Sequence, residues 1–172
     1  MSKMTSATAN KLLKTLNERV THLYQVESNC MTYTAIQGID PIVPEYDINA
    51  VREEISTLNG RIVTLKHEIN KFNVETVIPS LGLTIDAVLV QMKQLTTEKN
   101  RLDSMRSNQP KTINSSYVSR STNNQVEYRV ANYDPKVAEK MYQEVSEQLT
   151  RLQLELDLCN NTIEFEVSDA GE

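Results

Sequence analysis

"INAVREEISTLNGRIVTLKHEINKF" (residues 48–72) carries apolar side chains at two positions of every heptad. The first position is always isoleucine and the second is Val, Leu or Phe; the eight residues are Ile48, Val51, Ile55, Leu58, Ile62, Leu65, Ile69 and Phe72. A stripe of this kind stabilises a helix only when a second helix covers it. The stretch therefore predicts a helix over 48–74 that packs in a helical bundle or a coiled coil.

The rest of the chain predicts three more helices, at residues 7–30, 84–107 and 135–161. Asp47 and Thr84 are expected to cap the helices that follow them, because their side chains accept backbone N–H groups. Asp134 followed by Pro135 is the strongest helix start in the chain. The heptad pattern returns in the last helix, whose stripe includes Leu149, Leu152 and Leu156.

Residues 113–132 change to an alternation of polar residues with apolar or aromatic ones. Asn123 and Asn124 lie near the middle, and asparagine tolerates the positive φ of a two-residue hairpin turn. In that register Arg120 lies opposite Glu127. Because an isolated hairpin is only marginally stable, a helix surface or another subunit must cover its apolar face, which comprises Tyr117, Val126, Tyr128 and Val130.

The composition favours long helices over a rounded core. Hydrophobic residues make up 39% of the 172, aromatic residues only 5%, and tryptophan is absent. We therefore expect one mainly α domain over 1–172: an elongated antiparallel helical bundle or coiled coil, with one β-hairpin inserted before the last helix. The acidic segment 162–172 is expected to be a tail whose last residues are mobile.

Two ways of covering the stripes stay open. The short and moderate loops favour antiparallel hairpins within one chain, whereas the Ile-and-Leu seam also suits a parallel coiled coil between chains. We expect a homo-oligomer, with an unidentified protein partner as a further possibility. The expected self-association seam consists of the eight residues of the quoted stretch with Leu149, Leu152 and Leu156.

No pattern that carries chemistry stands out. Four glycines leave no phosphate-binding loop, and His22 and His67 lie on separate expected helices. Cys30 and Cys159 lie far apart, without metal-ligand spacing or an activating neighbour in sequence. We therefore expect no enzyme activity, no cofactor and no metal. A polar N-terminus and the shortness of the longest apolar cluster, "IDAVLVQM", predict a cytoplasmic protein with no membrane association.

A basic belt over residues 99–136 is the alternative functional feature. It holds seven basic and three acidic side chains in a chain of net charge −5. Basic groups interleaved with tyrosines can follow a phosphate backbone and stack on bases. A solvated, partly ion-paired hairpin explains the same pattern, so nucleic-acid binding is the second hypothesis; its contact residues would be Arg106, Lys111, Tyr117, Arg120, Tyr128 and Arg129.

Four stretches carry a resemblance to a known family: "INKFN" (69–73), "GLTIDAVL" (82–89), "VEYRVANYD" (126–134) and "LELDLCNN" (154–161). Over residues 10–162 the order of elements resembles that of uncharacterised bacterial helical proteins that are sometimes labelled septicolysin. The family usually ends in an Asn-Trp pair, where this chain has Asn160 and Asn161. The resemblance implies a helical, oligomeric fold and transfers no catalytic residue.

Overall fold

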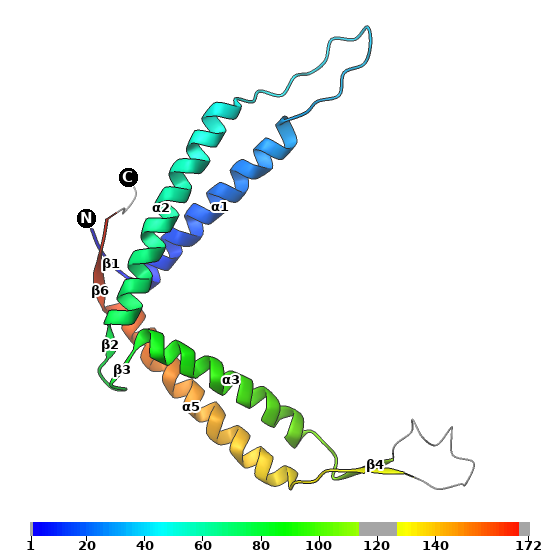
Figure 1. Cartoon of the computed structure of the whole chain (residues 1–172), viewed down its shortest axis with the longest axis vertical. Coiled ribbons are helices and arrows are strands. Elements are labelled where there is room, and N and C mark those ends of the chain that lie inside the picture. The colour runs from blue at the N-terminus through cyan, green and yellow to red at the C-terminus, as the bar shows by residue number, and fades with distance from the viewer. Residues whose placement is uncertain (1, 114–126, 169–172) are drawn as a thin grey trace. The chain divides into compact units, whose positions relative to one another are not determined.

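The computed structural model describes residues 2–113 and 127–168, and most of these residues lie in four helices (Figure 1). The helices are α1 (Ser6–Cys30), α2 (Ile48–Glu75), α3 (Ile85–Arg106) and α5 (Pro135–Thr162). The strands are β1 (Ser2–Thr5), β2 (Val77–Ile78), β3 (Leu83–Thr84), β4 (Lys111–Ile113), β5 (Tyr128–Val130) and β6 (Glu164–Val167). The chain is therefore mainly α with a β-hairpin before its last helix, as the sequence predicts.

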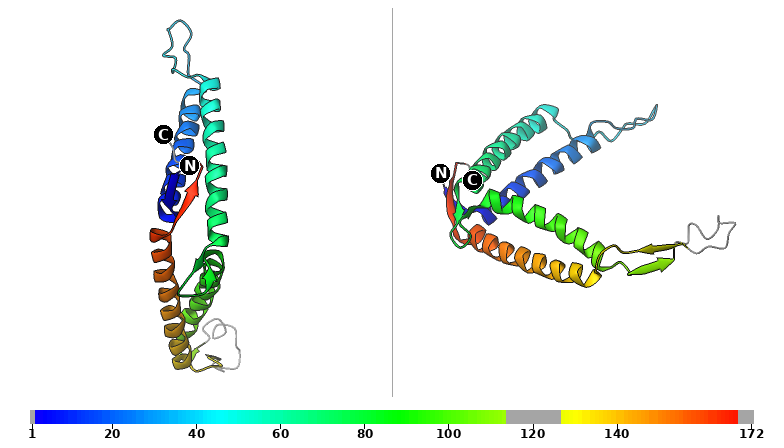
Figure 2. Two further views of the ribbon diagram at one scale, coloured as in Figure 1. Left: turned by 90° about the vertical axis from the view of Figure 1, so that its left-hand side faces the viewer. Right: turned by 60° about the horizontal axis from the view of Figure 1, so that its bottom comes forward.

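The chain divides into two compact units. Unit 1 comprises residues 1–76 and 157–172, and unit 2 comprises residues 77–156. In unit 1, α1 and α2 run side by side in opposite directions; in unit 2, α3 and α5 do the same (Figures 1 and 2). Each unit is thus built on an antiparallel pair of helices.

The core of unit 1 lies between the facing stripes of α1 and α2. The stripe of α2 packs in one cluster with the apolar face of α1 and with the last residue of β6. The buried members of this cluster are Ala9, Leu16, Val20, Leu23, Ile55, Leu58, Leu65, Ile69 and Val167. The heptad spacing therefore places its isoleucines and leucines against a helix of the same chain.

Polar side chains cap the helices at the positions that the sequence indicates. The Asp47 side chain accepts from the backbone N–H groups of Asn49 and Ala50 at 2.8 and 3.3 Å, and Thr84 accepts from that of Ala87 at 3.2 Å. Both predicted caps are confirmed. α5 begins at Pro135, as expected from a proline that lacks the N–H group a helix start leaves unpaired.

The strand pair β1–β6 was not predicted from the sequence. The two strands are antiparallel, with Lys3 opposite Glu166 and Met4 opposite Phe165. The Phe165 ring stacks on Phe72 of α2 with centroids 4.5 Å apart. The expected acidic tail is thus corrected: from Glu164 to Val167 it is a strand, because its alternate apolar residues face the core of unit 1 while its glutamates remain exposed.

The hairpin before the last helix is present, but its register differs from the prediction. The turn expected at Asn123 and Asn124 would have placed Tyr128 opposite Ser119; in the structure Tyr128 lies opposite Ile113. Pairing is fixed next to the helices, where the N–H of Ala131 donates to the carbonyl of Pro110 at 3.0 Å. The expected turn and the predicted partner Arg120 lie outside the described residues.

The two units repeat the same local plan. Thr5 caps α1 and Thr84 caps α3, each by accepting from the backbone N–H three residues later. A glutamate at an equivalent position of α2 and of α5 accepts a hydrogen bond from a serine. Glu68 accepts from Ser168, which follows β6, and Glu155 accepts from Ser80, in the turn after β2. The ends of the helical pairs away from these strands differ, and there the candidate site is found.

Candidate functional site

The heptad seam of α2 is covered within the chain. Val51 and Ile62 are half-buried against α1, whereas Ile48, the first residue of the helix, is 55% exposed. The buried positions are Ile55, Leu58, Leu65, Ile69 and Phe72. Because α1 takes up this seam, association with another molecule needs apolar surface elsewhere on the chain.

The stripe of α5 is also covered. Leu152 and Leu156 are buried and Leu149 is half-buried. Beside this stripe, Lys99 and Arg106 of α3 lie over the Tyr142 ring, with Nζ and Cζ 5.3 and 4.0 Å from the ring centroid. A cation over an aromatic face is a favourable contact. These two basic residues therefore contribute to the packing of unit 2.

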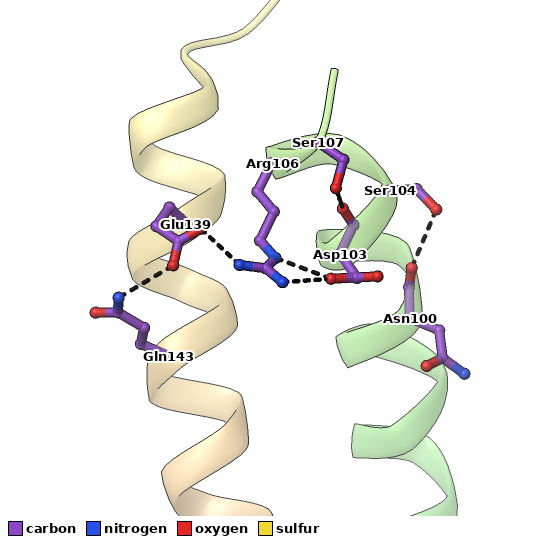
Figure 3. Close-up of polar contacts among 7 residues, drawn as sticks. All are labelled: Asn100, Asp103, Ser104, Arg106, Ser107, Glu139 and Gln143. Carbon is purple, nitrogen blue, oxygen red and sulfur yellow. Dashed lines mark hydrogen bonds and ion pairs between the residues drawn. The ribbon is translucent and has the colours of Figure 1, made fainter. Parts of the chain in front are cut away.

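Arg106, a candidate nucleic-acid contact, is engaged by carboxylates. Its guanidinium pairs with Asp103 on its own helix at 2.7 Å and with Glu139 of α5 at 3.0 Å (Figure 3). The hydrogen bonds that Arg106 donates to these two carboxylates raise the pKa of its guanidinium. Glu139 also accepts from Gln143 at 3.1 Å. Arg106 thus ties the end of α3 to α5 instead of presenting a free cation.

The β-hairpin exposes an apolar face, which we call the hairpin face. Alternation along β4 and β5 puts four paired residues on one side: Lys111, Ile113, Tyr128 and Val130. All four are exposed, and the Lys111 ammonium lies 3.8 Å from the centroid of the Tyr128 ring. Arg129 points to the other side and is exposed. Within the described residues, no helix or other segment covers this face, although a stable hairpin is expected to need such a cover.

Tyr133 fixes the base of the hairpin to α3. Its hydroxyl donates to the Met105 carbonyl at 2.9 Å and accepts from the Asn108 side chain at 2.7 Å. The strands of the hairpin face therefore start from an anchored position. Tyr117 and Arg120, the remaining candidate contacts of the basic belt, lie outside the described residues.

The second candidate surface is the connecting loop, residues 31–47, which joins α1 to α2. Ile42 is 94% exposed, and the other large apolar side chains of the loop are exposed too: Met31, Tyr33, Ile36, Ile39 and Val43. The exposed apolar surface of this loop was not predicted from the sequence. The signal was present, since residues 31–39 contain no charged side chain.

The connecting loop is anchored where it meets the helices. The Glu27 carboxylate of α1 pairs with Arg52 of α2 at 2.7 Å and accepts from the Tyr46 hydroxyl at 3.2 Å. Burial, and then the charge of Glu27, raise the pKa of Tyr46. At the far end, Gly38 has φ +84° in a turn closed by the N–H of Ile39 and the carbonyl of Ile36. The loop is thus held at its base and displays apolar side chains at its turn.

A cavity of about 310 Å³ in unit 1 lies beside the stacked Phe72 and Phe165. Its polar walls are mainly carboxylates, from Glu68, Glu75 and Glu166, with Lys71 as the basic member. Glu68 is engaged by the backbone N–H of Ser168 at 3.1 Å. The cavity wall therefore holds the residue after β6 in place through Glu68, which also accepts from the Ser168 hydroxyl.

The histidines and cysteines stay apart. His22 and His67 are exposed, Cys30 is half-buried, and burial raises the pKa of the Cys159 thiol. Within residues 2–113 and 127–168, no cluster of three or more His, Cys, Asp or Glu side chains is arranged to hold a metal ion. In the same part of the chain, none of the helices combines the length and the apolar character needed to cross a membrane.

Comparison with known proteins gives a likeness of fold. No protein-family model matches the chain, and no curated protein matches it. A crystal structure of a protein described as a functionally unknown conserved protein from Corynebacterium diphtheriae is similar, with a TM-score of 0.71 and 19% sequence identity. The match covers 96% of this chain and 100% of that one. The helical fold thus occurs in an uncharacterised bacterial protein, and the septicolysin label gains no support.

Proposed function

We propose that the protein is a self-associating helical scaffold or interaction protein without catalytic activity. One observation carries the proposal: the heptad stripes are covered inside the chain, yet apolar side chains of the connecting loop and the hairpin face remain exposed. These side chains do not serve the core of either unit. Contiguous exposed apolar surface at defined places is typical of protein–protein contact sites.

Nucleic-acid binding remains the alternative. Among the described residues it would depend on Lys111, Tyr128 and Arg129, because Arg106 is paired with Asp103 and Glu139. The Lys111 ammonium already lies over the Tyr128 ring, where a base would have to stack. These contacts favour the interaction protein. Salt-sensitive oligonucleotide binding that is lost in Lys111→Glu/Arg129→Glu would favour the alternative instead.

The test is the mass of the full-length chain in solution. Light scattering coupled to gel filtration, over a series of micromolar concentrations, should give masses above the 19.6 kDa of one chain that rise with concentration. A mass that stays at 19.6 kDa throughout would refute self-association.

A further inference from the structure

The connecting loop is acidic as well as apolar. No lysine or arginine occurs between Arg19 and Arg52, whereas Asp40, Glu45 and Asp47 lie within the loop. Pro41 and Pro44 remove two backbone donors from its second half. The loop is therefore suited to contact a partner through side chains and not as an added β-strand, and that partner should offer apolar groups bordered by positive charge.

The hairpin face has those complementary properties. Ile113, Tyr128 and Val130 are 60%, 50% and 61% exposed. Lys111 stands among them on the same face, whereas the Arg129 side chain lies on the opposite side of the strand pair. The apolar groups thus come with one cation, Lys111, on three-residue strands whose base is anchored to α3.

We propose that the connecting loop of one copy docks on the hairpin face of a second copy. The inference rests on the proposed function and names its contact. Burial of the loop isoleucines against Ile113, Tyr128 and Val130 removes apolar surface from water on both sides. Asp40 and Glu45 approach Lys111, the cation of that face, so charge complementarity selects the docking orientation.

Charge also disfavours the two symmetric contacts, which are loop against loop and hairpin face against hairpin face. Two connecting loops would bring together two sets of carboxylates with no compensating cation, and two hairpin faces would bring together the Lys111 ammonium of each copy. Like charges placed opposite one another disfavour association. A contact between unlike surfaces leaves a free loop and a free hairpin face on every pair, so further copies can add.

Two variants of the full-length chain test the contact. The loop variant is Ile36→Ser/Ile39→Ser/Ile42→Ser, and the hairpin variant is Ile113→Ser/Val130→Ser. All five side chains are exposed, so both variants should keep the circular dichroism of the wild type. Each variant alone should need a concentration at least about tenfold higher to self-associate. The control is Val63→Ser, which replaces an exposed residue of α2 outside both surfaces and should associate like the wild type.

Mixing the variants identifies the pairing. The loop variant keeps an intact hairpin face and the hairpin variant an intact loop, so an equimolar mixture should form dimers at concentrations where each variant alone is monomeric. Growth should stop at the dimer, because each copy has one functional surface. Raised salt should weaken wild-type association, because the contact includes exposed charges.

The other results would overturn the inference. A loop variant that self-associates like the wild type would exclude this contact while the proposed function stands. Two monomeric variants whose mixture forms no dimer would exclude a contact between one loop and one hairpin face. One variant that self-associates like the wild type while the other stays monomeric would indicate a contact between like surfaces. A wild-type chain that is monomeric throughout would remove the proposed function itself. Loss of phospholipid-vesicle binding in the loop variant of such a monomer would assign the loop to a lipid surface.

Discussion

Glu27 shows how a charged residue is placed within an apolar stripe. The Leu, Val and Cys spacing of α1 continues past it, yet its side chain is only 14% exposed. Arg52 and Tyr46 supply a cation and a hydroxyl donor, which offset the loss of water around the carboxylate. The residue that interrupts the stripe therefore anchors the base of the connecting loop.

Ionisation of Tyr46 is expected to weaken the folded state. Half-burial and the Glu27 carboxylate raise its pKa above the usual 10.0 in the folded chain. The stabilisation that protonated Tyr46 gives to the folded state is fully present below pH 10 and is lost as pH rises through the higher folded-state pKa. Urea unfolding on both sides of pH 10 should show a smaller fall in stability for Tyr46→Phe than for the wild type. Tyr24→Phe, at an exposed tyrosine of α1, is the control; equal slopes for wild type and Tyr46→Phe would contradict the assignment.

The two cysteines should differ in reactivity. Cys159 is 4% exposed and burial raises the pKa of its thiol, whereas Cys30 is half-buried at the last residue of α1. Because the thiolate is the reactive form, an aromatic disulfide reagent should modify Cys30 in the native protein and Cys159 only after unfolding. Cys30→Ser and Cys159→Ser isolate the two rates. Equal native rates would show that Cys159 is accessible.

At the scale of an element, alanine substitutions at two glycines should change the free energy of unfolding in opposite directions. A Cβ at Gly60 in α2 or at Gly38 in the connecting loop would meet nothing within 4 Å, so only backbone conformation separates the two sites. Gly60→Ala should raise the free energy of unfolding by about 1 kcal/mol through helix propensity. Gly38→Ala should lower it by about 1 kcal/mol, because φ is +84° there. Chemical denaturation measures both, and effects of the same sign would be inconsistent with this reasoning.

The helices were predictable because their signals are local. Heptad spacing and the caps at Asp47, Thr84 and Asp134 set their bounds to within about two residues, a smaller error than is usual for element ends. The pairing of β1 with β6 was missed because no local pattern links residues so distant in sequence. Alternation of Ile163, Phe165 and Val167 with glutamates did offer a sign of a strand.

Of the two candidate surfaces, the hairpin face was partly predictable from the sequence, and the apolar surface of the connecting loop was not predicted. Alternation in "VEYRV" placed Tyr128 and Val130 on one face and showed that this face needs a cover. The hairpin register was misassigned because the interactions that fix it, through Tyr133 and Ala131, come from the helix ends. The apolar surface of the connecting loop was missed because the exposure of its isoleucines depends on what the fold leaves uncovered.

At the scale of the whole molecule, β6 joins residues far apart in sequence into unit 1. Val167 of this strand is fully buried, while Val130 of β5 is 61% exposed. Val167→Ala should lower the free energy of unfolding by about 2 kcal/mol, from two lost methyl groups and the space they leave. Val130→Ala, the same change in an exposed strand, should stay within about 0.5 kcal/mol. Urea denaturation compares them, and equal effects would mean that β6 contributes little to the core.

The split composition of unit 1 has a consequence for biosynthesis. A ribosome makes α1 and α2 first, but the segment that completes their unit emerges only after the whole of unit 2, which is continuous in sequence. Unit 2 can therefore fold before unit 1 is complete. Until Phe165 has been synthesised, Phe72 of the nascent chain lacks its stacking partner and is accessible to chaperones.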